Sequence, residues 1–478
     1  MIEKRNFYIN GSWVPPKNPK DIEVINPATE KNCAVISLGS KEDINDAVLA
    51  AKEAFKTWGF TSKEERLSLL EVFYSLYKKR WNDITDAIIQ EMGAPKDFAS
   101  KLQTGTGASH TKSFIRYLKE FEFEKPLGDH AKNQRIIYEP KGVCALITPW
   151  NWPINQVTLK VIPALASGCT MILKPSELAP LSAMIIAELI DEAKFPKGVF
   201  NLVNGDGEIT GDALTSHPDV NMISFTGSTR AGALISQNAA KDFKRVSLEL
   251  GGKGANIIFE DADAEAIERG AFRCFRNSGQ SCNAPTRMLV EKSIYNEAIE
   301  RLRKYANEFK VDDPNKNGEH IGPVISETQF NKIQGLIQKG IDEGAKLVAG
   351  GVGKPNGLND GYYVKPTVFA DVKNEMEIAR TEIFGPVLSV IPFETEEEAI
   401  QIANDTDYGL AAGVFTKDVD MATKTASRLN GGQVYVNSWF TGSIATPFGG
   451  YKQSGYSREK GQQAIKSYLQ LKNVGIHL

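Results

Sequence analysis

The chain has 478 residues, of which 41% are hydrophobic and 24% are charged, a composition typical of a globular protein with two or three domains. Its net charge of −3 and its lack of a basic block exclude nucleic acid and anionic lipid as main partners. The N-terminus lacks the apolar core of a signal peptide, and no apolar run approaches transmembrane length, so we expect a cytoplasmic protein without membrane contacts.

The order of apolar runs predicts an α/β fold. Helical patterns come first, at residues 43–57 and 63–80, and short apolar runs then alternate with helical stretches. Near-continuous apolar runs are typical of strands buried on both faces, so this rhythm predicts a parallel sheet with right-handed crossovers. The expected strands are 143–147, 171–173, 199–203, 222–225 and 255–259, the helices between them are 181–193 and 231–240, and a second α/β pattern has strands at 288–290 and 388–391.

Two loops that follow expected strands carry polar residues where α/β sheets bind ligands. In the first loop, Trp150 and Asn151 lie between two prolines. The Asn151 amide would suit an oxyanion, although a turn asparagine is the simpler interpretation of this loop alone. In the second, Lys174 and Glu177 leave a strand end together. They would suit the two hydroxyls of a ribose, or form a solvated ion pair.

Two further loops are candidates for phosphate binding and for base catalysis. Residues 225–232 read as a strand, a glycine turn and a helix whose first N–H groups would suit a pyrophosphate, although Gly-x-x-x-x-Gly alone is a weak signal. The loop expected at 247–253 places Glu249 between two leucines. Apolar surroundings raise the pKa of a carboxyl towards general-base duty, and a structural ion pair is the alternative interpretation.

Cys282 has the sequence context of a nucleophile. Amides, hydroxyls and two arginines surround it between residues 275 and 287. A structural cysteine usually lies among apolar residues, whereas a polar, electropositive pocket favours the thiolate. The five cysteines are odd in number, scattered and without a Cys-x-x-Cys pair, so we expect neither a disulfide framework nor a metal site.

Seven short motifs follow one another along the chain. They are Pro149-Trp-Asn-Trp-Pro153, Leu173-Lys-Pro-Ser-Glu177, Phe225-Thr-Gly-Ser-Thr229, Leu248-Glu-Leu-Gly-Gly-Lys253, Gly279-Gln-Ser-Cys282, Glu382-Ile-Phe-Gly-Pro386 and Pro447-Phe-Gly-Gly-Tyr-Lys452. In order and spacing these motifs resemble the aldehyde dehydrogenase superfamily, and the similarity extends from residues 8–13 to residues 467–471.

The resemblance implies a fold of three parts. These are a Rossmann-like parallel-sheet cofactor domain, a second α/β catalytic domain and a small β oligomerisation arm. We expect the NAD-binding domain to comprise residues 1–117 and 141–251, the catalytic domain 252–448, and the arm 118–140 and 462–478. Such an arm implies a homodimer or homotetramer.

The resemblance also implies roles for individual residues. Cys282 would be the nucleophile, Glu249 the general base, and Asn151 part of the oxyanion hole together with the backbone N–H of Cys282. Lys174 and Glu177 would hold the adenosine ribose. Ser228 would bind the pyrophosphate, Trp150 would line the cofactor cleft, and Glu382 and Phe384 would position the nicotinamide riboside. The full set of expected cofactor residues is Ile147, Pro149, Trp150, Lys174, Ser176, Glu177, Gly207, Gly211, Phe225, Gly227, Ser228, Leu250, Glu382 and Phe384.

Cofactor and substrate preferences depend on single positions. Glu177 favours NAD because its carboxylate would repel a 2′-phosphate, with NADP possible if the side chain swings away. Arg276 stands where semialdehyde dehydrogenases carry an arginine, which would grip a remote carboxylate. The second arginine of those enzymes is replaced by Leu159, so a structural role for Arg276 stays open. Three aromatic residues are expected to line a broad substrate mouth, Trp152, Trp439 and Phe448.

The expected reaction is the oxidation of an aldehyde to a carboxylic acid. The Cys282 thiolate adds to the aldehyde, the thiohemiacetal expels hydride to the nicotinamide, and Glu249 activates water to hydrolyse the thioester. CoA-acylating relatives generally lack a glutamate at the position of Glu249. A catalytically silent homologue would lack Cys282, Glu249 or Asn151, and all three are present. Both alternatives are therefore disfavoured.

Overall fold

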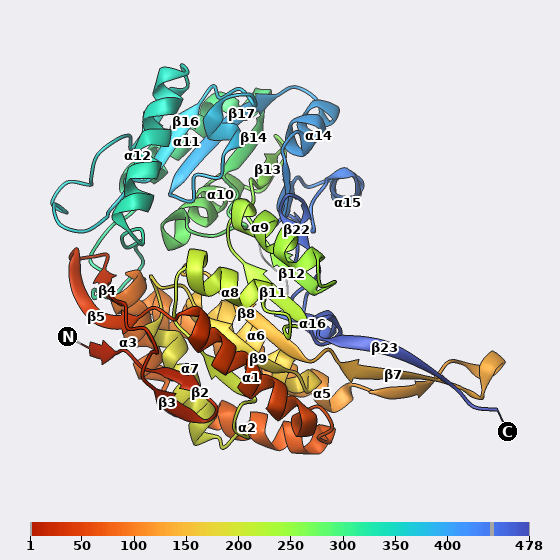
Figure 1. Cartoon of the computed structure of the whole chain (residues 1–478). Helices are drawn as coiled ribbons and strands as arrows, with labels where there is room; N and C mark the ends of the chain where they lie inside the picture. Colours follow the sequence, from red (N-terminus) through yellow and green to blue (C-terminus); the bar gives the residue numbers. More distant parts are fainter. Residues whose placement is uncertain (1, 440–443, 478) are drawn as a thin grey trace.

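The computed structural model describes residues 2–439 and 444–477, which form a mixed α/β protein built on two large sheets (Figure 1). The first sheet has eight strands, and its five central strands are parallel. In spatial order these are β12 (Arg245–Glu249), β11 (Met222–Thr226), β8 (Val143–Ile147), β9 (Thr170–Lys174) and β10 (Phe200–Leu202). The edges are β22 (Gly455–Tyr456) and the hairpin of β2 (Phe7–Ile9) and β3 (Ser12–Val14).

The strand order of the first sheet reverses beside β8. The chain passes outward from β8 to β9 and β10, and then returns to β11 on the other side of β8. Such a reversal opens a crevice at the carboxyl ends of β8 and β11, where sheets of this kind bind ligands.

Helices cover both faces of the first sheet because its strands are apolar on both sides. One face packs against α1 (Lys41–Trp58), α8 (Asp212–Ser216) and α9 (Thr229–Ala240). The other packs against α2 (Lys63–Lys79), α3 (Trp81–Met92), α5 (Gly105–Glu120), α6 (Pro153–Ser167) and α7 (Leu181–Glu192). A small sheet of β1 (Ile2–Lys4), β5 (Lys31–Ser37) and β4 (Asp21–Asn26) lies near the N-terminus.

The second sheet has seven strands and forms the core of the other half of the body. In order they are β15 (Lys346–Ala349), β16 (Thr367–Ala370), β17 (Val387–Phe393), β14 (Arg287–Glu291), β13 (Ala255–Ile258), β19 (Ala411–Phe415) and β20 (Gln433–Val436), and only β15 pairs antiparallel. Its helices are α10 (Ala266–Phe275) and α11 (Tyr295–Glu308) on one face, and α12 (Glu327–Asp342), α14 (Glu396–Asn404) and α15 (Val419–Arg428) on the other.

A three-stranded antiparallel arm projects from the body and ends near the C-terminus (Figure 1). It consists of β6 (Glu124–Pro126), β7 (Gln134–Pro140) and β23 (Leu469–Gly475). The arm is shorter than the ranges expected for it, because residues 118–120 still belong to α5 and residues 462–467 to α16 (Gly461–Ser467). Residues 1 and 478 of the expected domains lie outside the described part of the chain.

One predicted loop is a strand. Residues 245–249 form β12, and Glu249 is its last residue rather than part of a loop. The prediction missed this strand because its exposed first residue, Arg245, and half-buried Val246 break the continuous apolar pattern of its neighbours. In the described residues, no helix combines the length and the apolar character that membrane crossing requires.

Candidate active site

Cys282 lies in the loop between α10 and β14, and the backbone of this loop is held in an unusual conformation. Asn277, Ser278 and Gly279 all have positive φ angles, of 56°, 57° and 72°. Glycine is required at the last position because an added Cβ would clash with the backbone of Gly385. The two non-glycine residues carry strain of about 1–2 kcal/mol each, a cost that recurs at functional sites.

Two tryptophans fix the residues on either side of Cys282. Trp152 donates its indole N–H to the Ser281 hydroxyl at 2.9 Å, and Trp439 donates to the Asn283 carbonyl at 3.1 Å. The thiol is thus braced from the start of α6 and from the segment after β20.

Two cavities meet at Cys282. One, of about 490 Å³, opens beside Trp152 and Trp439, and the other, of about 240 Å³, lies at the carboxyl ends of β8, β11 and β12. Cys282 and Gln156 line both cavities. A molecule in either cavity would therefore approach the same sulfur.

The smaller cavity, called the cleft below, brings together seven of the predicted cofactor residues. They come from the ends of β8 and β11, from the segment after β12 and from the loop before β17 of the second sheet. Trp150 and Phe384 pack edge to face at 5.3 Å across the two halves of the body. The seven are Pro149, Trp150, Gly227, Ser228, Leu250, Glu382 and Phe384.

The remaining predicted cofactor residues do not line this cleft. Ile147 and Phe225 are buried in the core of the first sheet. The buried Lys174 amine donates to the Gly205 carbonyl at 2.5 Å and lies 3.8 Å from the Glu177 carboxylate. Gly211 is adjacent to Lys174, so part of this set clusters beyond the end of β9. The roles of Ile147, Lys174, Ser176, Glu177, Gly207, Gly211 and Phe225 remain predictions.

Glu382 joins the two halves of the body at the cleft. Its carboxylate accepts a hydrogen bond from the Gly252 N–H at 2.9 Å, and burial raises the pKa of Glu382 to about 7. Helix α12 fixes the same loop, since Gln329 donates to the carbonyls of Ile383 and Phe384, and Lys332 donates to that of Glu382.

Glu249 is a buried carboxyl that faces the cleft without a hydrogen-bond partner among the described residues. Burial, followed by repulsion from Glu459, raises its pKa well above the usual range. Lys160, Lys460 and other cations act in the opposite direction. Lys160 forms a buried ion pair with Glu459 and also donates to the Ser224 hydroxyl at 3.2 Å. The sequence motif identified Glu249 but gave no sign of this charged layer behind it.

Asn151 faces the same cleft. Its side-chain amide donates one N–H to the Gln280 carbonyl at 2.9 Å, and the backbone carbonyl of Asn151 accepts from the side chains of Asn277 and Gln103. The side-chain amide has two N–H groups, so a second donor remains beside Cys282.

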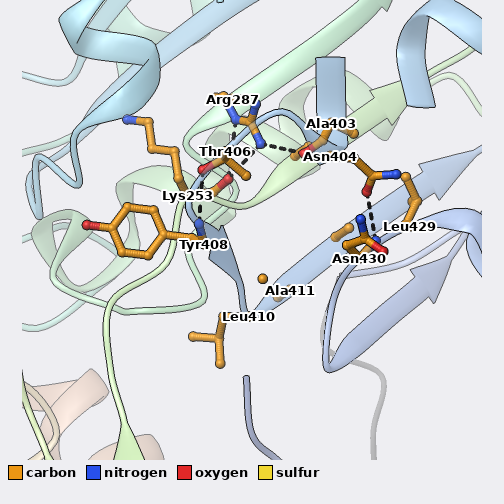
Figure 2. A pocket seen from close by; sticks show the side chains of 13 residues that line it. Lys253, Arg287, Ala403, Asn404, Thr406, Tyr408, Leu410, Ala411, Leu429 and Asn430 are labelled. Carbon is orange, nitrogen blue, oxygen red and sulfur yellow. Dashed lines mark hydrogen bonds between the residues drawn. The ribbon is translucent and has the colours of Figure 1, made fainter. Parts of the chain in front are cut away.

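The segment that connects the two sheets passes beneath the Cys282 loop. An added Cβ at Gly252 would clash with the Cys282 carbonyl oxygen. The next residue, Lys253, is anchored by the buried Arg287 guanidinium, which donates to its carbonyl at 3.0 and 3.2 Å and to that of Ala403 (Figure 2). The same guanidinium also donates to the Ile402 carbonyl. The position of the thiol therefore depends on the core of the second sheet.

The larger cavity brings together all four predicted substrate residues, Trp152, Arg276, Trp439 and Phe448. The Arg276 guanidinium stacks on the rings of Phe98 at 5.2 Å and Phe272 at 5.6 Å. Burial lowers the pKa of Arg276 to about 10. This stacking leaves the guanidinium at the wall of the larger cavity, and both roles expected for Arg276 remain predictions.

Several residues that line the two cavities had no signal in the sequence motifs. Arg273 lies in the last turn of α10, three residues before Arg276, which directly follows the helix, and this spacing could have revealed it. His110 and Lys460 come from α5 and from the start of α16, and only the packing of distant segments places them at this cavity. Among the described residues, no aspartate or glutamate lines the larger cavity, and no cluster of metal-ligating side chains is found.

Comparison with known proteins agrees with this geometry. The aldehyde dehydrogenase family matches residues 13–474. A 3-succinoylsemialdehyde-pyridine dehydrogenase from a Pseudomonas species is 49% identical, with 99% of each chain covered. An aldehyde dehydrogenase structure from Bartonella henselae has a TM-score of 0.98 at 55% identity and covers 99% of this chain and 100% of its own. A mutant of aldehyde dehydrogenase C from Pseudomonas syringae, in complex with NAD+ and octanal, has a TM-score of 0.96 at 46% identity, with 98% and 96% covered.

Proposed function

Because the chain belongs to the aldehyde dehydrogenase family, it is an NAD-dependent oxidoreductase that oxidises aldehydes, and we propose that Cys282 is its nucleophile. The observation that carries this proposal is that Cys282 lines both cavities. An aldehyde in the larger cavity and a nicotinamide ring in the cleft would meet at this sulfur.

The residues of the cleft fit a dinucleotide. Ser228 lines the cleft at the start of α9, where the N–H groups of the first turn that its hydroxyl does not cap would suit a pyrophosphate. Glu382 and Phe384 would hold the nicotinamide riboside, and Lys174 with Glu177 the adenosine ribose. NAD, when bound, accepts the hydride. Glu177 favours NAD, and its partly exposed side chain leaves NADP possible.

The protein residues would act in sequence. The Cys282 thiolate bonds to the carbonyl carbon, and the oxygen becomes an alkoxide that the second Asn151 N–H and the Cys282 backbone N–H stabilise. One such donor contributes roughly 3–4 kcal/mol. Loss of hydride leaves a thioester on Cys282. Glu249 then takes a proton from water, the hydroxide displaces the thiolate, and the carboxylic acid leaves. The presence of Glu249 supports hydrolysis rather than acyl transfer to CoA.

Substitution of single cysteines tests the nucleophile. Cys282→Ala should abolish NADH formation and retain NAD binding, which is measurable by calorimetry. Cys33→Ala is the matched control because Cys33 is the other partly exposed cysteine and lies outside both cavities. Substantial aldehyde oxidation by Cys282→Ala would overturn the assignment.

A finer proposal concerns the substrate, which we infer to carry a carboxylate far from its aldehyde group. Arg273 and Arg276 both line the larger cavity, and the contacts of their guanidinium groups among the described residues are with the aromatic rings of Phe272 and Phe98. Semialdehyde dehydrogenases carry a second arginine at the position of Leu159, and in this chain Arg273 would supply the second guanidinium instead.

Paired substrates test this specificity. Arg276→Ala and Arg273→Ala should each lower kcat/KM for succinic semialdehyde by about 10- to 150-fold, because a charge-assisted contact contributes roughly 1.5–3 kcal/mol. Butanal should change little or improve. An equal loss for both aldehydes would mean that the arginines only support the fold, and a wild-type preference for butanal would exclude the carboxylate.

We also propose that the protein is a cytoplasmic homodimer or homotetramer that assembles through its arm. Residues Gln470, Leu471, Lys472 and Asn473 of β23 are exposed in the single chain. Within the described part of the chain the strand pairs along one edge, with β7, and its other edge has no partner strand.

A further inference from the structure

Lys460 is a buried amine in the wall of the larger cavity. An isolated antiparallel bridge between Phe448 and Glu459 places Lys460 beside the Phe448 side chain, and its ammonium lies 4.5 Å from the centre of that ring. Only 8% of Lys460 is exposed, and Cys282 and Phe448 line the same cavity. Its backbone has a φ angle of 63°, a strained conformation for a lysine.

The charges around Cys282 are mostly unfavourable to a thiolate. The pKa of the Cys282 thiol is raised to about 12, first by burial and then by the carboxylates of Glu382 and Glu249, whereas Lys460 acts in the opposite direction. Lys460 in turn faces Cys282, Glu459 and Glu249, which favour its charged form, while burial lowers the pKa of Lys460 to about 8.

Two other ionisable side chains near Lys460 and Cys282, His110 and Tyr435, do not supply a positive charge at neutral pH. His110 lines the same cavity, but burial and the charge of Lys460 lower its pKa to about 3, so it is neutral at pH 7. The Tyr435 hydroxyl is near enough for Cys282 to raise its pKa and is also neutral. Lys460 is therefore the cation whose charge opposes the effect of the Glu382 and Glu249 carboxylates on the pKa of Cys282.

We infer that Lys460 is a positioning residue whose ammonium group stabilises the thiolate of Cys282 at neutral pH. The inference rests on the proposed role of Cys282 as the nucleophile. The thiol proton leaves to solvent, and the negative charge that remains on sulfur is balanced by the ammonium in the same cavity. Because Lys460 loses its own proton above about pH 8, this stabilisation is present below that pH and fades above it.

The test measures how fast iodoacetamide alkylates Cys282, followed by peptide mass spectrometry without cofactor or aldehyde. At pH 7, Lys460→Met and Lys460→Gln should react about 10-fold more slowly than wild type, since one pKa unit corresponds to a tenfold change in thiolate. Lys460→Arg should retain the wild-type rate. Above about pH 8 the wild-type rate should level off towards that of Lys460→Met, whereas Lys460→Arg should keep rising because its guanidinium stays charged.

Wild-type alkylation rates in both neutral variants at pH 7 would overturn the inference. The same holds if Lys460→Arg is as slow as Lys460→Met, because side-chain volume rather than charge would then be responsible. NAD affinity and circular dichroism identify any variant that is misfolded. Since alkylation needs no turnover, this result is independent of the Cys282→Ala experiment, which tests the nucleophile itself.

Discussion

At the scale of single residues, the site depends on carboxyl groups whose charge is disfavoured by burial. Glu249 has no hydrogen-bond partner among the described residues, and repulsion from Glu459 adds to the effect of burial on its pKa. A carboxyl in this position takes up a proton readily and returns it, as a general base near neutral pH must. The buried ion pair of Lys160 and Glu459 supplies the surrounding charges.

Glu249 should control the pH dependence of thioester hydrolysis. Because burial raises its pKa, the carboxylate is lost as the pH falls through a value well above the usual range of a glutamate. We expect steady-state turnover to rise with pH through that value. In Glu249→Gln this dependence should disappear, and the rate should fall by about 10²- to 10⁴-fold. The measurement is kcat between pH 5 and 9.

Glu308→Gln, an exposed glutamate on α11, is the control and should behave as wild type. An unchanged pH profile in Glu249→Gln would show that another group accepts the proton.

At the scale of elements, the site is assembled where segments from both sheets touch. The connection after β12 passes beneath the Cys282 loop, and α12 holds the loop of Glu382 and Phe384 from the other side. Small residues are needed where these backbones approach.

Gly252→Ala should disable catalysis without unfolding the protein. The new Cβ would displace the Cys282 carbonyl, and a shift of about 1 Å in a reacting group costs on the order of 100-fold in rate. We expect this loss in kcat/KM while circular dichroism remains unchanged. Gly335→Ala in α12 is the matched control because open space surrounds that position. Normal activity in Gly252→Ala would mean that the loop adjusts freely.

The sequence predicts elements best where local pattern decides them. Strands β8 and β9 are buried along their whole length, and their apolar runs predicted them almost residue by residue. β12 was missed because it has a partly exposed start beside the short strand β22. Motifs located Cys282 and Glu249, but Lys460 reaches the cavity only through packing between distant segments, which no local pattern encodes.

At the scale of the whole molecule, the two halves of the body each contribute one side of the cleft. The motifs are far apart in the sequence, and the strand reversal at β8 together with the loops before β14 and β17 of the second sheet brings them to one place. The arm projects away from the strands that line the cleft (Figure 1), so the assembly proposed for it would use a different surface from the chemistry.

Leu471→Asp should weaken assembly. Leu471 is 66% exposed in the single chain and lies on β23, where a partner would bury it, so a charge there would have to be desolvated. Light scattering after size exclusion should show a dimer or tetramer for wild type and a smaller species for the variant. Leu347→Asp, on edge strand β15 of the second sheet, should leave the mass unchanged. A monomeric wild type would contradict the proposed assembly.

The covalent step at Cys282 is the central claim, and trapping the acyl-enzyme tests it most directly. Glu249→Gln is incubated with NAD and an aldehyde that the wild-type enzyme oxidises, digested, and analysed by peptide mass spectrometry. We predict one acyl group per chain on the peptide that contains Cys282, together with about one NADH per site. NADH formation without acylated Cys282, or acylation at a different cysteine, would contradict the account.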